Sequence, residues 1–130
     1  EYFKSRTIPM SPTELCNCDF LDRSIYPVTK VTLGNGKERQ EVTVNSKLAV
    51  DDFEIIKQAA IDGIGIAMLP EYMCQQDIVN GELINVLPEW SMKPVNIYAL
   101  YPQHRAKIPK VKAFLEFLEE TFSQKRFCLR

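Results

Sequence analysis

The stretch DDFEIIKQAAIDGIGIAMLP, residues 51–70, carries the clearest fold signal in this chain of 130 residues. Asp51 is suited to cap the start of a helix, and Glu54 follows in capping-box position. Apolar residues then recur at helical spacing. The apolar run 64–69, which a proline ends, is typical of a strand buried on both faces. A helix that leads into a buried strand predicts an α/β fold.

The residues before this stretch predict strands. Residues 20–25 are a short strand candidate, and residues 28–33 and 41–44 alternate between apolar and polar side chains. The sequence Gly34-Asn35-Gly36 lies between the two alternating segments and is suited to a tight turn. Together these segments predict a β-hairpin.

The residues after it predict further elements of an α/β fold. A short helix fits residues 71–77, and residues 83–87 and 95–101 have the composition of strands. Pro109 suits the first turn of a closing helix. The apolar stripe of that helix consists of Val111, Phe114, Leu115, Leu118 and Phe122.

Composition and charge limit the function. With 45% hydrophobic and 25% charged residues, the chain has the composition of one globular domain, or of one lobe plus part of another. The formal net charge of −1 argues against binding of nucleic acid by this chain alone. The longest apolar stretch, residues 63–70, is much shorter than a membrane span needs, so we expect no membrane partner. The chain begins with Glu1, and we expect it to be a piece of a longer protein.

Metal and nucleophilic chemistry are not expected. Cys16 and Cys18 form a CxC pair, and Cys74 and Cys128 are isolated, which is not the spacing of a zinc site. The single histidine, His104, has no nucleophile motif to serve. We therefore expect no catalytic residue, no metal and no cofactor, and we interpret the cysteines as reduced thiols.

Two features at the ends of the central helix have alternative interpretations. Asp51 and Asp52 are suited either to acid–base chemistry or to capping, with the N–H groups of residues 52–54 left to hold a small anion. Gly63 and Gly65 resemble part of a nucleotide-binding motif, but they follow a helix and precede a strand, which is the wrong order. The pattern points to binding without turnover.

Four stretches resemble one known family in order and spacing. They are residues 45–70 (NSKLAVDDFEIIKQAAIDGIGIAMLP), 81–90 (GELINVLPEW), 97–105 (IYALYPQHR) and 110–122 (KVKAFLEFLEETF). They closely resemble the effector-binding domain of LysR-type transcriptional regulators, and residues 2–21 are also similar to that family. The resemblance covers essentially the whole chain. It implies an α/β fold, namely a lobe like those of type II periplasmic binding proteins, with a mixed sheet flanked by helices.

The resemblance also implies a domain organisation. Residues 1–94 correspond to the second lobe, regulatory subdomain II, of the effector-binding domain. Residues 95–130 correspond to the return crossing strand and the C-terminal helix of the first lobe, and the rest of that lobe and the DNA-binding domain are absent. We expect a cytoplasmic, non-enzymatic domain of a bacterial regulator. It would bind a small-molecule inducer between two lobes and so control the conformation of a DNA-bound oligomer.

The expected partners are a small-molecule effector, other copies of the protein in a homodimer or homotetramer, and DNA only through the N-terminal domain. The family's effector-binding positions, carried over to this sequence, are Leu48, Val50, Asp51, Asp52, Phe53, Gly63, Gly65 and Ile66. Sheet packing and a helix C-terminal turn are alternative roles for Leu48, Val50 and the two glycines. Some family members present a hydroxyl at the positions of Leu48 and Val50, so polar recognition is not expected there.

Two other functions remain open at this point. Peroxide-sensing members of the family keep a reactive cysteine in the stretch that corresponds to residues 16–23, although Cys16 and Cys18 do not occupy the matching position. An enzyme on the same fold would need an acid–base pair such as Asp51 and Asp52 with shifted pKa values. Self-association is expected through residues 95–101 and the closing helix, because five large apolar side chains on one face favour burial.

Overall fold

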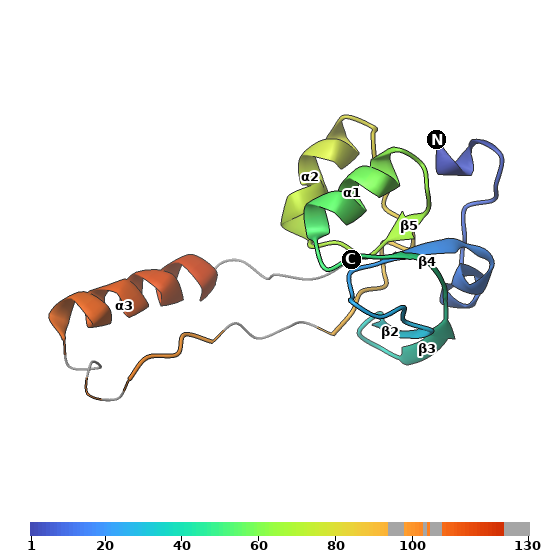
Figure 1. The fold of residues 1–130 in the computed structure, drawn as a ribbon. Coiled ribbons are helices and arrows are strands. Elements are labelled where there is room, and N and C mark those ends of the chain that lie inside the picture. The colour runs from blue at the N-terminus through green and yellow to red at the C-terminus, as the bar shows by residue number, and fades with distance from the viewer. Residues whose placement is uncertain (94–97, 103, 105–107, 124–130) are drawn as a thin grey trace. The chain divides into compact units, whose positions relative to one another are not determined.

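The computed structural model describes residues 1–93, 98–102, 104 and 108–123. These residues form two compact units, one of residues 1–93 and one from the described part of residues 94–127 (Figure 1). Within the described residues, no helix is long and apolar enough to cross a membrane. The expected boundary between a second lobe and a return crossing, after residue 94, remains a prediction.

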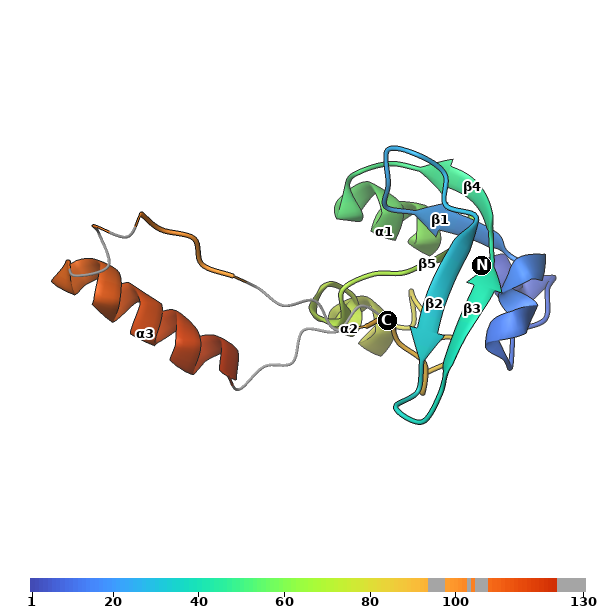
Figure 2. The same cartoon turned by 90° about the horizontal axis from the view of Figure 1, so that it is seen from below.

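A three-stranded parallel sheet forms the centre of the first unit. Its strands are β1 (Asp19–Asp22), β4 (Asn45–Ala49) and β5 (Ile66–Ala67), in the order β4-β1-β5. Figure 2 shows β1 in the middle. Because all three strands run in the same direction, their carboxyl ends lie at one edge of the sheet.

The predicted hairpin is confirmed. Strands β2 (Lys30–Gly34) and β3 (Arg39–Thr43) pair antiparallel. The Asn35 side-chain oxygen accepts hydrogen bonds from the backbone N–H groups of Lys37 and Glu38, both at 3.0 Å. These bonds close the turn between the two strands.

Two helices cover the sheet on the face opposite the hairpin (Figure 1). Helix α1 (Phe53–Ile61) confirms the central helix, and α2 (Glu71–Val79) confirms the short helix and extends it by two residues. The predicted N-cap is wrong by one residue. Asp52, not Asp51, caps α1, because its side chain accepts hydrogen bonds from the N–H groups of Glu54 at 2.8 Å and Ile55 at 3.1 Å.

Two hydrophobic cores lie on the two faces of β1. Phe20 belongs to the core under the hairpin, and Leu21 belongs to the core under α1 and α2. Consecutive residues of a strand point to opposite faces, so β1 contributes to both cores. The hairpin core consists of Leu15, Phe20, Val31, Leu33, Val42 and Val44. The helix core consists of Leu21, Ile56, Ala59, Leu69 and Cys74.

The strand predictions need corrections. The strand expected at residues 20–25 is β1, which is shorter. The run 64–69 yields only the two-residue β5, which is half-buried because it lies at the edge of the sheet. Residues 83–87 form no strand, because the described residues offer them no neighbouring strand to pair with. Of the strand expected at residues 95–101, residues 95–97 lie outside the described part and residues 98–101 are not in a strand.

The closing helix is confirmed as α3 (Pro109–Ser123) in the second unit. Two short 3-10 helices, η1 (Tyr2–Lys4) and η2 (Pro12–Asn17), begin the chain. On α3, Val111, Leu115 and Leu118 are half-buried, and Phe114 is 59% exposed. Of the stripe residues whose side chains the structure describes, Phe114 alone is exposed.

Candidate functional site

The carboxyl edge of the parallel sheet is the first candidate site. Strands β1 and β4 both end here, with Asp22 opposite Ala49 in the register, and three residues separate the end of β4 from the start of α1. The backbone N–H of Val50 donates to the carbonyl oxygen of Asp22 at 3.0 Å. Ligands of open α/β sheets bind in the crevice outside the carboxyl ends of the strands. This edge is therefore the place where the fold favours a small molecule.

The Arg23 side chain contacts two others at this edge. Arg23 follows β1 directly, and its guanidinium lies 2.9 Å from a carboxylate oxygen of Asp51. The same guanidinium lies over the ring of Phe53, 4.6 Å from the ring centroid. We call Arg23, Asp51 and Phe53 the edge cluster. Arg23 was not among the predicted site residues, because the strand expected at residues 20–25 contained it, whereas β1 ends at Asp22.

The start of α1 is less open to an anion than the sequence suggested. The N–H of Glu54, expected to be available, donates to Asp52. The carboxylates of Asp51, Asp52 and Glu54 also surround this helix end, and like charge opposes the binding of an anion. The expectation that this N–H would hold an anion is therefore wrong.

The apolar residues predicted to bind effector have packing roles. Leu48, Val50 and Phe53 are partly buried against the helix core, whose fully buried members are Leu21 and Ile56. Their backbone still lies at the carboxyl edge, next to Asp51 and Asp52. The structure thus brings the predicted residues 48–53 together in one place.

The predicted residues 63–66 lie elsewhere. Asp52 and Gly63 lie at opposite ends of α1, and a nine-residue helix is about 13.5 Å long. A Cβ atom on Gly63, where φ is +76°, would lie 2.7 Å from the Cβ of Glu1, and one on Gly65 would lie 2.4 Å from the carbonyl oxygen of Asp19. Close packing therefore accounts for both glycines without a ligand.

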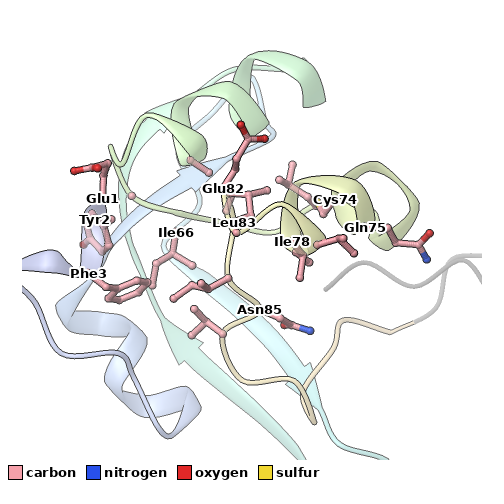
Figure 3. Close-up of a pocket in the computed structure, with 18 of the residues that line it drawn as sticks. Glu1, Tyr2, Phe3, Ile66, Cys74, Gln75, Ile78, Glu82, Leu83 and Asn85 are labelled. Atoms are coloured by element: carbon pink, nitrogen blue, oxygen red, sulfur yellow. The ribbon is translucent and has the colours of Figure 1, made fainter.

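A cavity of about 740 Å³ lies on the outer side of β5. Figure 3 shows it between η1, α2 and the segment 82–86. Of the predicted site residues, Gly65 and Ile66 line this cavity, and the other six do not. We call it the β5 groove. The sequence does not predict this groove, because residues that are distant in the chain form its walls. The lining residues include Tyr2, Phe3, Ala67, Cys74, Ile78, Leu83, Ile84 and Val86.

Reactive groups are sparse in the described part of the chain. No three His, Cys, Asp or Glu side chains there are placed to hold a metal ion. Burial raises the pKa of the Cys18 thiol and the pKa of the Cys74 thiol above their ordinary values. Cys16 is exposed. The two buried thiols are therefore poor nucleophiles at neutral pH.

Comparisons with known proteins identify the class. The HTH-type transcriptional regulator PtxR of Pseudomonas aeruginosa is 30% identical over 122 residues, which are 92% of this chain and 39% of PtxR. The HTH-type transcriptional activator TtdR of Escherichia coli is 32% identical over 91% of this chain and 38% of TtdR. The regulatory domain of AphB from Vibrio vulnificus matches with a TM-score of 0.70 and 26% identity, over 92% of this chain and 60% of that structure. The chain is thus an α/β regulatory domain of the kind found in transcriptional regulators.

The LysR substrate binding domain family matches residues 3–123, and the chain belongs to this family. The predicted resemblance and the predicted fold class, a lobe like those of periplasmic binding proteins, are confirmed. The chain spans about two fifths of the length of the curated relatives it matches.

Proposed function

We propose that this chain is the effector-sensing part of a bacterial LysR-type transcriptional regulator and that it binds a small-molecule inducer. The observation that carries the proposal is the family match over residues 3–123. The carboxyl edge of the sheet, where β1 and β4 end and α1 begins, supports it with a place for the ligand.

In this proposal the edge cluster and residues 48–53 form one wall of the effector site, and a second lobe supplies the other wall. Arg23 offers the effector a guanidinium, and Phe53 offers part of an aromatic face. Gly63, Gly65 and Ile66 lie at the far end of α1, so this wall does not include them. Closure of the two lobes on the inducer would change the conformation of the DNA-bound oligomer.

The proposal does not include catalysis. The two carboxylates that an enzyme would use are engaged in other roles: Asp51 pairs with Arg23, and Asp52 caps α1. The matched relatives are transcriptional regulators. A regulator that acts on DNA works in the cytoplasm, where we place this protein. It would contact DNA through a separate helix-turn-helix domain.

Ligand screening on the whole regulator tests the effector proposal. Small metabolites are screened for a rise in melting temperature, and a ligand at 100 times its Kd stabilises the folded state by about 2.7 kcal/mol. Arg23→Met should reduce the affinity of the ligand found by at least about tenfold. Arg39→Met, on β3 of the hairpin, is the matched control and should leave the affinity unchanged. An unchanged affinity of Arg23→Met would remove the edge cluster from the site.

Self-association through the second unit is the other part of the proposal. Phe114 and Phe117 on α3 are 59% and 60% exposed, which favours burial against another surface. The double variant Phe114→Glu, Leu118→Glu should lower the association state of the whole regulator in sedimentation. If the variant sediments like the wild type, α3 is not part of the interface.

A further inference from the structure

Asp22, the last residue of β1, is only 7% exposed, and no other charged residue in the described part of the chain is buried. A carboxylate loses favourable contacts with water when it is buried, and hydrogen bonds must replace them. An apolar side chain would avoid this cost at the end of a strand that packs against two cores. The buried carboxylate of Asp22 therefore points to a specific role.

This carboxylate holds the far end of the loop that joins β1 to β2, residues 23–29 (Figure 2). One of its oxygens accepts a hydrogen bond from the backbone N–H of Val28 at 2.8 Å. The carbonyl oxygen of Asp22 accepts a hydrogen bond from the N–H of Val50 at 3.0 Å. The side chain and the backbone of Asp22 thus fix two stretches that meet at the carboxyl edge, namely the loop and the segment before α1.

Most of loop 23–29 is exposed. Ile25 and Tyr26 are 77% and 76% exposed, so their large apolar side chains do not anchor the loop in a core. The hydroxyl of Ser24 accepts a hydrogen bond from the N–H of Tyr26 at 3.1 Å, which closes only a local turn. The bond between Val28 and Asp22 joins residues six positions apart, so it closes the loop as a whole.

Arg23 is the first residue of this loop and belongs to the edge cluster. Its guanidinium lies 2.9 Å from a carboxylate oxygen of Asp51 and over the ring of Phe53, although the Arg23 side chain is 46% exposed. An arginine side chain has many rotamers, and its direction depends on the backbone that carries it. Binding residues are placed precisely when neighbouring residues hold their backbone and rotamers. Asp22 is suited to do this for Arg23, because it precedes Arg23 in β1 and closes the loop behind it.

We propose that Asp22 is a positioning residue of the effector site, and that its carboxylate holds loop 23–29 in the conformation that places Arg23 beside Asp51 and Phe53. The inference rests on the proposed function, because it concerns the same site. Groups that are ordered before binding lose less conformational entropy when the effector binds, so the affinity is higher. Asp22 acts through the loop and does not itself contact the effector.

Chemical modification of the whole regulator without effector tests the positioning. Phenylglyoxal reacts with accessible guanidinium groups, and peptide mass mapping measures the rate at each arginine. Asp22→Leu removes the acceptor of the Val28 N–H, so Arg23 should react at least about threefold faster in this variant than in the wild type. Asp22→Asn keeps an acceptor oxygen, so Arg23 should react near the wild-type rate.

Arg39 and Val42 provide the controls. Arg39 lies on β3 and should react at the same rate in every variant. Val42→Ala removes apolar contacts from the hairpin core and lowers the stability, but it should leave the rate at Arg23 unchanged. Equal rates at Arg23 in Asp22→Leu and the wild type would overturn the inference. An equal rise in Val42→Ala would also overturn it, because Asp22 would then contribute to stability alone.

Binding of the metabolite found in the ligand screen gives the functional test. Asp22→Leu should weaken this binding at least about tenfold, and Asp22→Asn should stay within about threefold of the wild type. If Arg23→Met weakens binding but Asp22→Leu does not, the inference is wrong and the proposed function stands. No effect of Arg23→Met would remove the edge cluster from the effector site, and this inference with it. If no metabolite binds, the proposed function fails, whereas the rates at Arg23 still decide whether Asp22 positions this side chain.

Discussion

Arg23 lies over the aromatic ring of Phe53, with its guanidinium carbon 4.6 Å from the ring centroid. Such a contact is worth about 0.5–1 kcal/mol at an exposed site. It joins the residue that follows β1 to the first residue of α1. Two residues that are 30 positions apart in sequence thus meet at the carboxyl edge of the sheet. The ion pair between Arg23 and Asp51 is a second contact between the same two segments.

The start of α1 yields the first prediction. Asp52→Ala should cost about 1 kcal/mol of unfolding free energy, because two backbone N–H groups lose their acceptor. Asp51→Ala removes only an exposed ion pair and should cost less. Urea denaturation of both variants measures the difference. A larger loss for Asp51→Ala would mean that the helix begins one residue earlier.

Neighbouring isoleucines on α1 give a matched pair of variants. Ile56 is 0% exposed in the helix core, and Ile55 is 52% exposed. Ile56→Ala should lower the unfolding free energy by about 2–5 kcal/mol, since it leaves a cavity. Ile55→Ala should cost less than about 1 kcal/mol. Similar losses for the two variants would show that α1 presents a different face to the sheet.

The close contact at Gly65 predicts a steric effect. A Cβ at this position would lie 2.4 Å from the carbonyl oxygen of Asp19, so Gly65→Ala should force the backbone apart and lower the melting temperature. Gly34→Ala is the control, because its Cβ would meet its nearest neighbours at 3.4 Å. Thermal unfolding measures the melting temperatures of the two variants. A melting temperature of Gly65→Ala equal to that of the wild type would refute the close approach of Gly65 to the carbonyl oxygen of Asp19.

The Asp19 carboxylate predicts a pH dependence. Hydrogen bonds from Arg6, and then from Lys47, lower the pKa of Asp19 below its ordinary value of 3.8. Its stabilising contribution should therefore be complete above about pH 4 and should be lost as the pH falls through the folded-state pKa. Urea midpoints of the wild type and Asp19→Asn should differ at neutral pH and converge in acid. A difference that stays constant down to strongly acidic pH would exclude this carboxylate as the cause.

The reactivity of the cysteine thiols distinguishes the proposed effector binding from the alternative function, a thiol-based redox switch. Cys16 should react with iodoacetamide at least about tenfold faster than Cys18 or Cys74, because burial raises the pKa of the latter two thiols. Peptide mass mapping after timed alkylation measures each rate. A disulfide from Cys16 to Cys18 or Cys74 that forms under peroxide would favour the redox switch instead.

The sequence predicted best those elements whose signals are local. The helical spacing of Ile56 and Ala59 and the turn at Asn35 required no distant partner, and α1 and the hairpin were found. Strand β4 (Asn45–Ala49) was not among the predicted strands, because Asn45, Ser46 and Lys47 do not alternate between polar and apolar side chains and its partner β1 is distant in sequence.

The errors have a common cause. The pattern of residues 83–87 gives the propensity for a strand but not the partner that a strand needs. Asp51 and Asp52 are both suited to capping, and only the backbone geometry selects Asp52. The family resemblance, and not a local pattern, groups residues 48–53 with residues 63–66. The structure holds the two groups at opposite ends of α1, and their contact with an effector stays a prediction.

Asp19 binds the first turn of the chain to the sheet. Its carboxylate accepts hydrogen bonds from Tyr2, Arg6 and Lys47, and its N–H donates to the Tyr2 hydroxyl at 2.7 Å. Strand β1 then continues to Arg23 with a hydrogen-bonded neighbour on each side. The four residues of β1 therefore connect the contacts of the first turn to the edge cluster at the other end of the strand.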